Sequence, residues 1–196
     1  MTAVAIIPAR GGSRRIPRKN IRPFFGKPML AYSIEVAQDS ALFHRVYVST
    51  EDEEIAKIAE QHQAIVIWRN AVLAQDSVGT QQVMYYALKE LRPIPDLACC
   101  IYPCAPLLQP SDLWRAYAAL TSGHDYAISV GANPLRDAGA FYFGKSDCFM
   151  RGDPLVSNQS AMIALPDSRV CDVNTEADWQ ECARLYAQMN GLQEAA

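Results

Sequence analysis

The chain has 196 residues, half of them hydrophobic, and a formal net charge of −3. This length and apolar content suit one globular domain over residues 1–196 with a full hydrophobic core. The sequence contains no run of about 18 uninterrupted apolar residues, so a membrane span is not expected. Mild overall acidity with one localised basic segment also argues against a nucleic-acid-binding face.

Six cysteines occur without the paired spacing that is typical of metal sites, and several lie in apolar segments. They indicate reduced thiols in the core. The amino terminus enters a strand directly and shows no signal-peptide pattern. Together these features predict a cytoplasmic protein.

The first 22 residues carry the strongest functional signal. An apolar run from Ala3 to Ile7 predicts a buried strand that ends at Pro8. Gly11 and Gly12 then give the backbone the freedom to turn amide N–H groups around an anion. The surrounding residues add a hydroxyl group and positive charge: Ser13, Arg10, Arg14, Arg15, Arg18, Lys19 and Arg22. This arrangement predicts a polyphosphate site, and we interpret its ligand as a nucleoside triphosphate.

An ordinary strand-to-helix turn on a basic surface is the alternative for this loop, since short glycine motifs often occur by chance. The charge distribution favours the anion site. No acidic residue precedes Glu35, yet seven of the 18 Lys and Arg residues do. The loop matches neither the Walker pattern nor the Gly-x-Gly-x-x-Gly pattern.

Strands and helices alternate along the chain. Strands are expected over 3–7, 45–49, 64–68, 97–102, 126–130, 139–143 and 162–165. Helices are expected over 28–37, after Thr50, and over 77–91, 110–121, 145–151 and 175–189. Two of them begin with capping-box spacing, Thr50 with Glu53 and Thr175 with Asp178. The alternation predicts an α/β fold with a mainly parallel sheet.

Ligands of open parallel sheets bind beyond the carboxyl ends of the strands. That edge should collect residues 9–22, 49–52, 103–107 and the segment that begins at Arg69. Arg69 is either a base-reading side chain or a solvated one. Asp172 ends a strand-like run over 169–172 and is either a Mg²⁺ ligand or a helix cap. Asp76 has a similar ambiguity between cap and site residue. No Ser-His-Asp or Cys-His set stands out, which favours chemistry by positioning and electrostatics.

Residues 7–20, Ile-Pro-Ala-Arg-Gly-Gly-Ser-Arg-Arg-Ile-Pro-Arg-Lys-Asn, closely resemble the signature of the CMP-sialic acid synthetase family. Four further stretches agree in order, at 48–56, 73–80, 102–106 and 137–144. The Tyr-Pro-Cys-Ala-Pro form of 102–106 is most similar to the pseudaminic acid cytidylyltransferase branch.

The resemblance implies a three-layer, Rossmann-like nucleotide-diphospho-sugar transferase fold, with CTP as substrate and Mg²⁺ as cofactor. A hydroxyl of a nonulosonic acid would attack the α-phosphorus, giving pyrophosphate and a CMP-sugar for surface-glycan synthesis. By position, the nucleotide would contact Arg10, Gly11, Gly12, Ser13, Arg14, Lys19, Asn20, Arg69 and Thr80. The sugar would lie beside Pro103, Cys104, Ala105 and Pro106. The catalytic residues would be Arg10, Lys19 and Asp172, and the metal ligands Asp172 and Asn174.

Two departures from the family pattern bear on activity. The usual Asp-x-Asp is Asp172-Val-Asn174 here, which should lower metal affinity and rate. Residues 129–136 run almost directly into Asp137, so most of the family's dimerisation arm is missing and a homodimer should be weakened. These departures leave open a degenerate homologue that binds nucleotide or a partner without turnover. A 3-deoxy-octulosonate cytidylyltransferase is a second alternative, disfavoured by the Arg-Gly-Gly-Ser loop.

Overall fold

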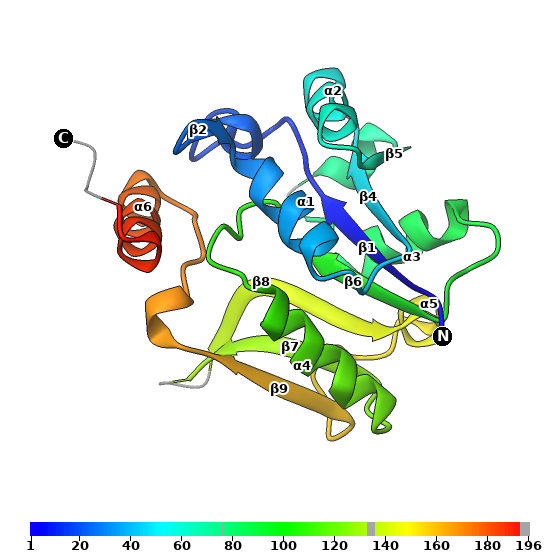
Figure 1. Cartoon of the computed structure of the whole chain (residues 1–196). Coiled ribbons are helices and arrows are strands. Elements are labelled where there is room, and N and C mark those ends of the chain that lie inside the picture. The colour runs from blue at the N-terminus through cyan, green and yellow to red at the C-terminus, as the bar shows by residue number, and fades with distance from the viewer. Residues whose placement is uncertain (76, 133–135, 193–196) are drawn as a thin grey trace.

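The computed structural model describes residues 1–75, 77–132 and 136–192 (Figure 1). Within these residues the main sheet has seven strands in the order β5-β4-β1-β6-β8-β7-β9. Their bounds are Ala3–Pro8 (β1), Arg45–Thr50 (β4), Ile65–Trp68 (β5), Leu97–Ile101 (β6), Tyr126–Gly131 (β7), Arg136–Lys145 (β8) and Ser160–Leu165 (β9). Strands β5, β4, β1 and β6 are mutually parallel, whereas β8 is antiparallel to both β6 and β7. The sheet is therefore mainly parallel, as the sequence predicts.

Helices cover both faces of this sheet. These helices are α1 (Met29–Asp39), α2 (Glu53–Gln61), α3 (Thr80–Glu90), α4 (Pro110–Thr121) and α5 (Ser146–Arg151), whereas α6 (Glu176–Asn190) does not pack on the sheet. Alternate residues of β1 point to opposite faces: Ala5 and Ile7 join the cluster with α1, α2 and α4, whereas Ile6 joins the cluster with α3 and α5. This arrangement confirms the three-layer, Rossmann-like fold.

Helix α6 lies apart from the sheet, beside a small hairpin made of β2 (Pro23–Phe24) and β3 (Lys27–Pro28) (Figure 1). Its contacts are largely aromatic. The Phe24 ring lies 5.4 Å from the ring of Trp179, edge to face, and Cys182 is buried in the same cluster. Burial of these apolar side chains attaches the end of the chain to the segment that follows the basic loop.

The helix starts differ in part from the predicted ones. Helix α2 is capped by Asp52, whose Oδ1 accepts the amide N–H groups of Glu54 and Ile55 at 3.0 Å each. The prediction that Thr50 caps it is wrong, because Thr50 still pairs with Trp68 as the last residue of β4. Thr175, by contrast, caps α6 in a reciprocal box with Asp178, as predicted.

Two other segments depart from the sequence analysis. Helix α3 begins at Thr80 rather than at residue 77, and Asp76 lies outside the described residues. Residues 169–172 do not form a strand in the part of the chain that the structure describes. After β9 the chain passes through Pro166 and a 3₁₀ turn over Asp167–Arg169, and Arg169 is held by Asp112. This turn leads the chain away from the sheet edge.

A wide bulge interrupts the pairing of β8 with β7. Ile128 pairs with Tyr142 and Val130 pairs with Asp137, so residues 138–141 lie opposite Ser129 alone. The buried Ser129 hydroxyl accepts the amide N–H groups of Ala140 and Phe141 at 3.2 and 2.9 Å and donates to the carbonyl of Phe141 at 3.0 Å. Because such bulges redirect side chains, this one determines where Asp137 and Tyr142 lie.

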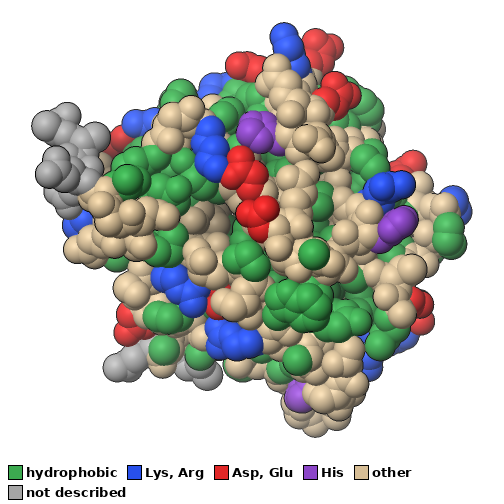
Figure 2. All heavy atoms as spheres, viewed as in Figure 1, with side chains coloured by type: hydrophobic (Ala, Val, Ile, Leu, Met, Phe, Trp, Pro, Cys, Tyr) green, Lys and Arg blue, Asp and Glu red, His purple; other side chains and the backbone are tan. Residues whose placement is uncertain are grey.

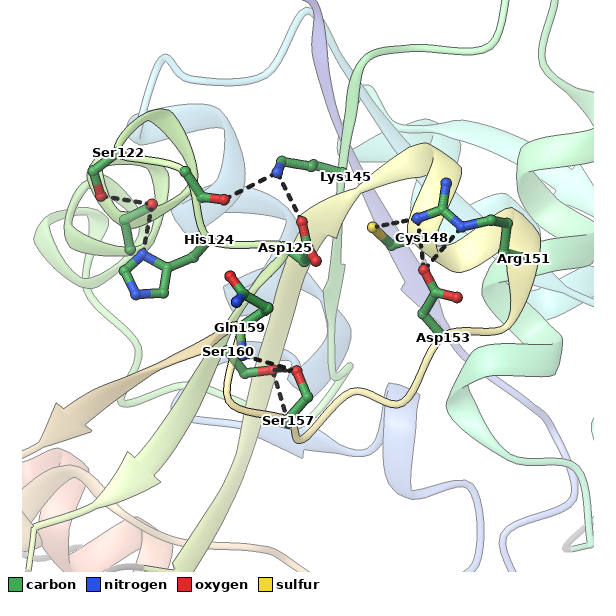
Figure 3. A network of polar contacts seen from close by, with 12 residues as sticks. Ser122, His124, Asp125, Lys145, Cys148, Arg151, Asp153, Ser157, Gln159 and Ser160 are labelled. Carbon is green, nitrogen blue, oxygen red and sulfur yellow. Dashed lines mark hydrogen bonds and ion pairs between the residues drawn. The ribbon is translucent and has the colours of Figure 1, made fainter.

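Polar contacts join the residue before β7, the end of β8 and the end of α5 to their neighbours (Figure 3). Lys145 Nζ lies 2.8 Å from Asp125 Oδ1, and it also donates to the carbonyl oxygen of Gly123. Arg151 pairs with Asp153 at 2.6 Å nearby. These pairs are exposed or partly exposed, so solvent screens them and each contributes little to stability.

The surface seen in Figure 2 carries charges of both signs, scattered between hydrophobic side chains. None of the helices in the described ranges has the length and apolar character needed to cross a membrane.

Asp112 is a buried carboxylate that connects α4 to the segment before α6. It is 1% exposed and pairs with Arg169 at 2.5 Å and with Arg115 at 2.8 Å. Burial alone would raise its pKa, but the hydrogen bonds from Arg169 and Arg115 outweigh burial and lower the pKa. The ionised form is therefore the one that stabilises the fold.

Replacing this carboxylate, Asp112→Asn, should lower the free energy of unfolding by about 3 kcal/mol at pH 7, because Arg169 loses its charged partner in a largely buried setting. Glu181→Gln, which breaks an exposed pair with Arg184, should cost far less, because solvent screens an exposed ion pair. Urea denaturation measures both.

The difference between wild type and Asp112→Asn should also shrink in acid. Because the folded-state pKa lies below the unfolded value of about 3.9, the stabilisation is present above that pH and is lost as the pH falls through the folded-state pKa. A difference that stays constant down to pH of about 2 would contradict the role given to the ionised carboxylate.

Candidate active site

A cleft of about 400 Å³ opens at the carboxyl ends of β1 and β6, where the sequence places the site. Six stretches contribute residues to its wall: 8–20, 69–75, 78–83, 102–104, 137–142 and 172–174. The basic loop and the Asp172 segment, more than 150 residues apart in sequence, therefore share one cavity. Residues 49–52 contact the loop from outside and do not line the cleft in the described part of the chain.

On the loop side, the cleft is lined by Arg10, Ser13, Arg15, Lys19 and Asn20. Asn20 is buried and holds the loop together. Its Nδ2 donates to the carbonyl of Arg10 at 2.9 Å, while its Oδ1 accepts from the thiol of Cys104 at 3.4 Å. Burial raises the pKa of Cys104 to about 12, so this thiol stays protonated and able to donate. The loop is thus connected to the end of β6.

Gly11 takes part in the site indirectly. Its amide N–H donates to Glu51 Oε1 at 2.8 Å, so a carboxylate of the protein occupies the position that the sequence analysis gave to an anion. Gly11, Gly12 and Arg14 are not among the described residues that line the cleft. Their contacts with the nucleotide remain predictions.

Arg69 is buried in the cleft wall. Its side chain is 6% exposed, and its Nε donates to Glu51 Oε2 at 3.2 Å. The interpretation of Arg69 as a solvated side chain is therefore wrong. Burial lowers its pKa, and the Glu51 charge opposes that shift. Glu51 connects Gly11 and Arg69, so one carboxylate fixes both the loop backbone and a cleft cation.

Thr80 and Tyr102 meet across the cleft from α3 and the end of β6. Thr80 Oγ1 lies 2.6 Å from Tyr102 Oη. Burial raises the pKa of Tyr102 to about 12, which keeps the phenol neutral near pH 7. Of the predicted sugar-side residues, Pro103 and Cys104 line the cleft, whereas Ala105 and Pro106 line a separate hollow of about 10 Å³.

The predicted metal residues Asp172 and Asn174 contact each other. Asn174 Nδ2 donates to Asp172 Oδ2 at 2.6 Å, and Arg15 Nη2 donates to Asn174 Oδ1 at 2.7 Å. Lys19 Nζ donates to the carbonyl of Val173 between them. The Asn174 oxygen, which the sequence analysis offered to a metal, is therefore occupied by a cation of the loop.

No group of three or more His, Cys, Asp or Glu side chains placed to hold a metal occurs in the described ranges. Mg²⁺ at a phosphate site needs only one or two protein carboxylates, because phosphate and water oxygens complete its shell. Asp172 lines the same cleft as the basic loop and fits that requirement as a single carboxylate ligand.

Asp137 and Tyr142 line the same cleft, and sequence reasoning did not single them out. The Tyr142 hydroxyl donates to Asp137 Oδ2, and the amide of Gly139 donates to Asp137 Oδ1 at 2.8 Å. Burial, together with this bond to Asp137, raises the pKa of Tyr142. The only sequence signal was their place in the 137–144 stretch, since the contact itself depends on the bulge.

Comparison with known proteins assigns the family. The cytidylyltransferase family model matches residues 4–145. The chain is 34% identical to the pseudaminic acid cytidylyltransferase of Campylobacter jejuni, over 95% of this chain and 97% of that protein. It is 30% identical to N-acylneuraminate cytidylyltransferase A of Danio rerio, over 89% of this chain and 48% of that protein.

Solved structures agree at the level of the fold. A CMP:2-keto-3-deoxy-manno-octonic acid synthetase complexed with CTP superposes with a TM-score of 0.79 at 17% identity, over 96% of this chain and all of that chain. A cytidylyltransferase from Leptospira borgpetersenii gives 0.73 at 16% identity, over 98% of this chain and 88% of that one. The fold is that of nucleotidyltransferases. More narrowly, the chain belongs to the cytidylyltransferase family.

The alignment with the Campylobacter protein extends over 224 residues, more than the 196 of this chain, so that relative contains residues that this chain lacks. In this structure β7 ends at Gly131 and β8 begins at Arg136, which leaves a short connection where the sequence analysis expects the missing arm. Residues 133–135 of that connection lie outside the described residues. The effect on dimerisation stays a prediction.

The two loop glycines should differ in their tolerance of a side chain. A Cβ on Gly11 would lie 2.2 Å from Asp52 Oδ2, whereas a Cβ on Gly12 meets nothing within 4 Å. Gly11→Ala should therefore displace Asp52 from its cap of α2 and from Arg18, lowering the free energy of unfolding by about 1–2 kcal/mol. Gly12→Ala, the matched control, should leave stability unchanged. Urea denaturation measures both variants, and equal free energies of unfolding for the two would refute this account.

Proposed function

We propose that this protein transfers CMP from CTP to a nonulosonic acid of the pseudaminic or sialic type. The products are pyrophosphate and a CMP-activated sugar for surface-glycan synthesis. One observation carries the proposal: a single cleft is lined by Arg10, Arg15 and Lys19 together with Asp137 and Asp172. Cations suit a triphosphate, and carboxylates suit the metal and the sugar hydroxyls. The likeness to CMP-sugar-forming enzymes supports it along nearly the whole chain.

In this proposal the basic loop binds the triphosphate. Arg10, Ser13 and Lys19 contact phosphate oxygens from inside the cleft, and Arg14 with the backbone of Gly11 and Gly12 adds charge and amide donors. Lys19, which now donates to the carbonyl of Val173, exchanges that partner for a phosphate oxygen. As negative charge builds on the departing pyrophosphate, Arg10 and Lys19 stabilise it from fixed positions.

The nucleoside lies further along the cleft. Asn20, already fixed by Arg10 and Cys104, holds the ribose region. Arg69 presents guanidinium N–H donors that a cytosine carbonyl oxygen and ring nitrogen accept, and Thr80 lies beside it. The sugar acid occupies the end bordered by 103–106, with Pro103 and Cys104 in the cleft wall.

Mg²⁺ would be held by Asp172, and when bound it neutralises charge on the phosphate oxygens. Asn174 aligns Asp172 through its amide and takes Arg15 as its own partner. We further propose that the reaction takes place in the cytoplasm without nucleic acid or membrane as partner.

A release assay for pyrophosphate tests the activity. Folded protein is given CTP and Mg²⁺ with pseudaminic acid, N-acetylneuraminic acid or 3-deoxy-octulosonate, and pyrophosphate is followed by a coupled enzyme reaction. We expect release with pseudaminic or N-acetylneuraminic acid that depends on both substrates. Silence with all three sugars would contradict the proposal.

A nucleotide-binding protein without turnover is the second candidate, and the exchange of the second carboxylate for Asn174 favours it. Thermal denaturation with CTP and Mg²⁺ separates the two. Stabilisation by ligand without any product would support this second candidate, because binding to the native state raises stability whether or not chemistry follows.

Asn174→Asp tests the metal assignment. The new carboxylate would lie against Asp172, where the amide now donates at 2.6 Å. Repulsion between the two should lower stability without metal by about 1 kcal/mol, or about 2–4 °C in the melting temperature. Added Mg²⁺ should then stabilise the variant more than wild type. Equal responses of both proteins to Mg²⁺ would show that the metal does not bind at this pair.

A further inference from the structure

We propose that Asp137 is a catalytic residue, which accepts the proton of the attacking sugar hydroxyl, and that Tyr142 is a positioning residue that orients it. The inference rests on the proposed CMP transfer. Among the described residues, two carboxylates line the cleft, Asp137 and Asp172, and of these the sequence analysis gave a role only to Asp172.

The bulge in β8 is what builds this pair. In a regular strand, residues five apart point to opposite faces and are separated by about 17 Å along the strand. Here residues 138–141 lie opposite Ser129 alone in β7, although Phe141 still pairs with Ile101 of β6, and the Tyr142 hydroxyl reaches Asp137 Oδ2. The Ser129 hydroxyl accepts hydrogen bonds from the backbone amides of Ala140 and Phe141 in this stretch. The buried Ser129 hydroxyl thus stabilises the local conformation that brings Tyr142 into contact with Asp137.

Asp137 is fixed at both oxygens yet remains accessible. Oδ2 accepts from Tyr142 and Oδ1 accepts from the Gly139 amide at 2.8 Å, while the residue is exposed in the cleft. Each carboxylate oxygen has a second lone pair, so both can still accept a hydrogen bond from a substrate hydroxyl. An oriented, solvent-accessible carboxylate is suited to take a proton from a bound alcohol.

Gly139 brings this pair close to Asp172. Its φ is +60°, and a Cβ there would lie 3.3 Å from Asp172 Cγ. The two carboxylates therefore occupy the same end of the cleft. Asp172 faces the phosphate side, since its neighbours Val173 and Asn174 bind Lys19 and Arg15. Asp137 belongs to β8, whose bulge residue Ala140 accepts the Tyr102 amide at 2.9 Å beside the proposed sugar end.

These positions divide the work between the two carboxylates. As the hydroxyl oxygen of the sugar forms its bond to the α-phosphorus, the bond from that phosphorus to the pyrophosphate oxygen breaks. The hydroxyl proton passes to Asp137, and the electron pair of the broken bond leaves with pyrophosphate, which the loop cations stabilise. Asp137 then returns its proton to water. Besides Asp137, the charged and titratable groups among the described residues that line the cleft are Tyr142, Tyr102, Cys104, Asp172, Lys19, Arg10, Arg15 and Arg69.

The test compares Asp137→Asn, Asp137→Glu and Tyr142→Phe with wild type. The control variant is Asp125→Asn, which removes a carboxylate that pairs with Lys145 away from the cleft (Figure 3). Steady-state assays use CTP, Mg²⁺ and whichever sugar acid wild type turns over, and calorimetry gives the Kd for CTP. Asp137→Asn should lower kcat by about 10²–10⁴-fold. KM for the sugar and Kd for CTP should change by about threefold or less, because the lost interaction acts in the transition state.

The conservative variants sharpen the assignment. Asp137→Glu keeps a carboxylate and should recover part of kcat, Tyr142→Phe should lose about tenfold because only orientation is lost, and Asp125→Asn should match wild type. Full kcat in Asp137→Asn would overturn the proposal. So would a loss that appears only in KM for the sugar, or one that tenfold more Mg²⁺ restores, since these indicate a sugar contact or a metal ligand. If the wild-type protein is inactive, both the proposed function and the role of Asp137 are overturned. If wild type is active and Asp137→Asn keeps full kcat, only the role of Asp137 is overturned.

Discussion

The position of the segment that carries Asp172 depends on cations from the amino-terminal loop. Lys19 binds the carbonyl of Val173, Arg15 binds Asn174, and Arg22 binds both carboxylate oxygens of Glu176 at 2.7 and 2.8 Å. The Arg22 guanidinium also stacks on Trp179, 4.4 Å from its ring centre. Each ionic contact is partly exposed and individually weak. Their combined geometry nevertheless places a carboxylate opposite the cations, which is the arrangement a metal–triphosphate complex requires.

A second constraint acts from the sheet. Strand β8 is antiparallel to its neighbours, so its first residues, rather than its last, lie at the edge where the parallel strands end. The bulge opposite Ser129 then turns Asp137 and Tyr142 toward each other and brings Gly139 against Asp172. The loop and the bulge therefore supply the two walls of one cleft, the first cationic and the second anionic. In the proposed reaction the cationic wall binds the triphosphate, and Asp137 on the other wall takes the proton of the sugar hydroxyl.

Local patterns in the sequence predicted most of the fold, because each pattern depends on neighbours in the chain. The apolar run of β1, the box of Thr175 with Asp178 and the bounds of α4 all follow from residues within a few positions of each other. Thr50 shows the limit of such reasoning. Its spacing to Glu53 fits a cap, but pairing with β5 extends β4 through Thr50, so Asp52 caps instead.

The basic loop was predictable because charge is concentrated there in the sequence, whereas Asn20 and Thr80 were named from the resemblance to the family. Arg10, Ser13, Lys19, Asn20, Arg69, Thr80 and Asp172 do line one cleft. The contacts that organise it were not readable, because they join distant segments: Glu51 with Gly11 and Arg69, Arg15 with Asn174, and Tyr142 with Asp137 across a bulge. Asn174 looked like a weakened metal ligand, and this stays a prediction; in the structure it contacts Asp172 and Arg15.

The central claim is that this cleft joins the α-phosphate of CTP to a sugar acid. Phosphorus-31 NMR of wild-type protein with CTP, Mg²⁺ and pseudaminic acid tests it most directly. The account predicts that the three CTP resonances decline together while a single phosphodiester resonance and pyrophosphate grow in equal amounts. Unchanged CTP, or its conversion to CDP and phosphate without a phosphodiester, would contradict it.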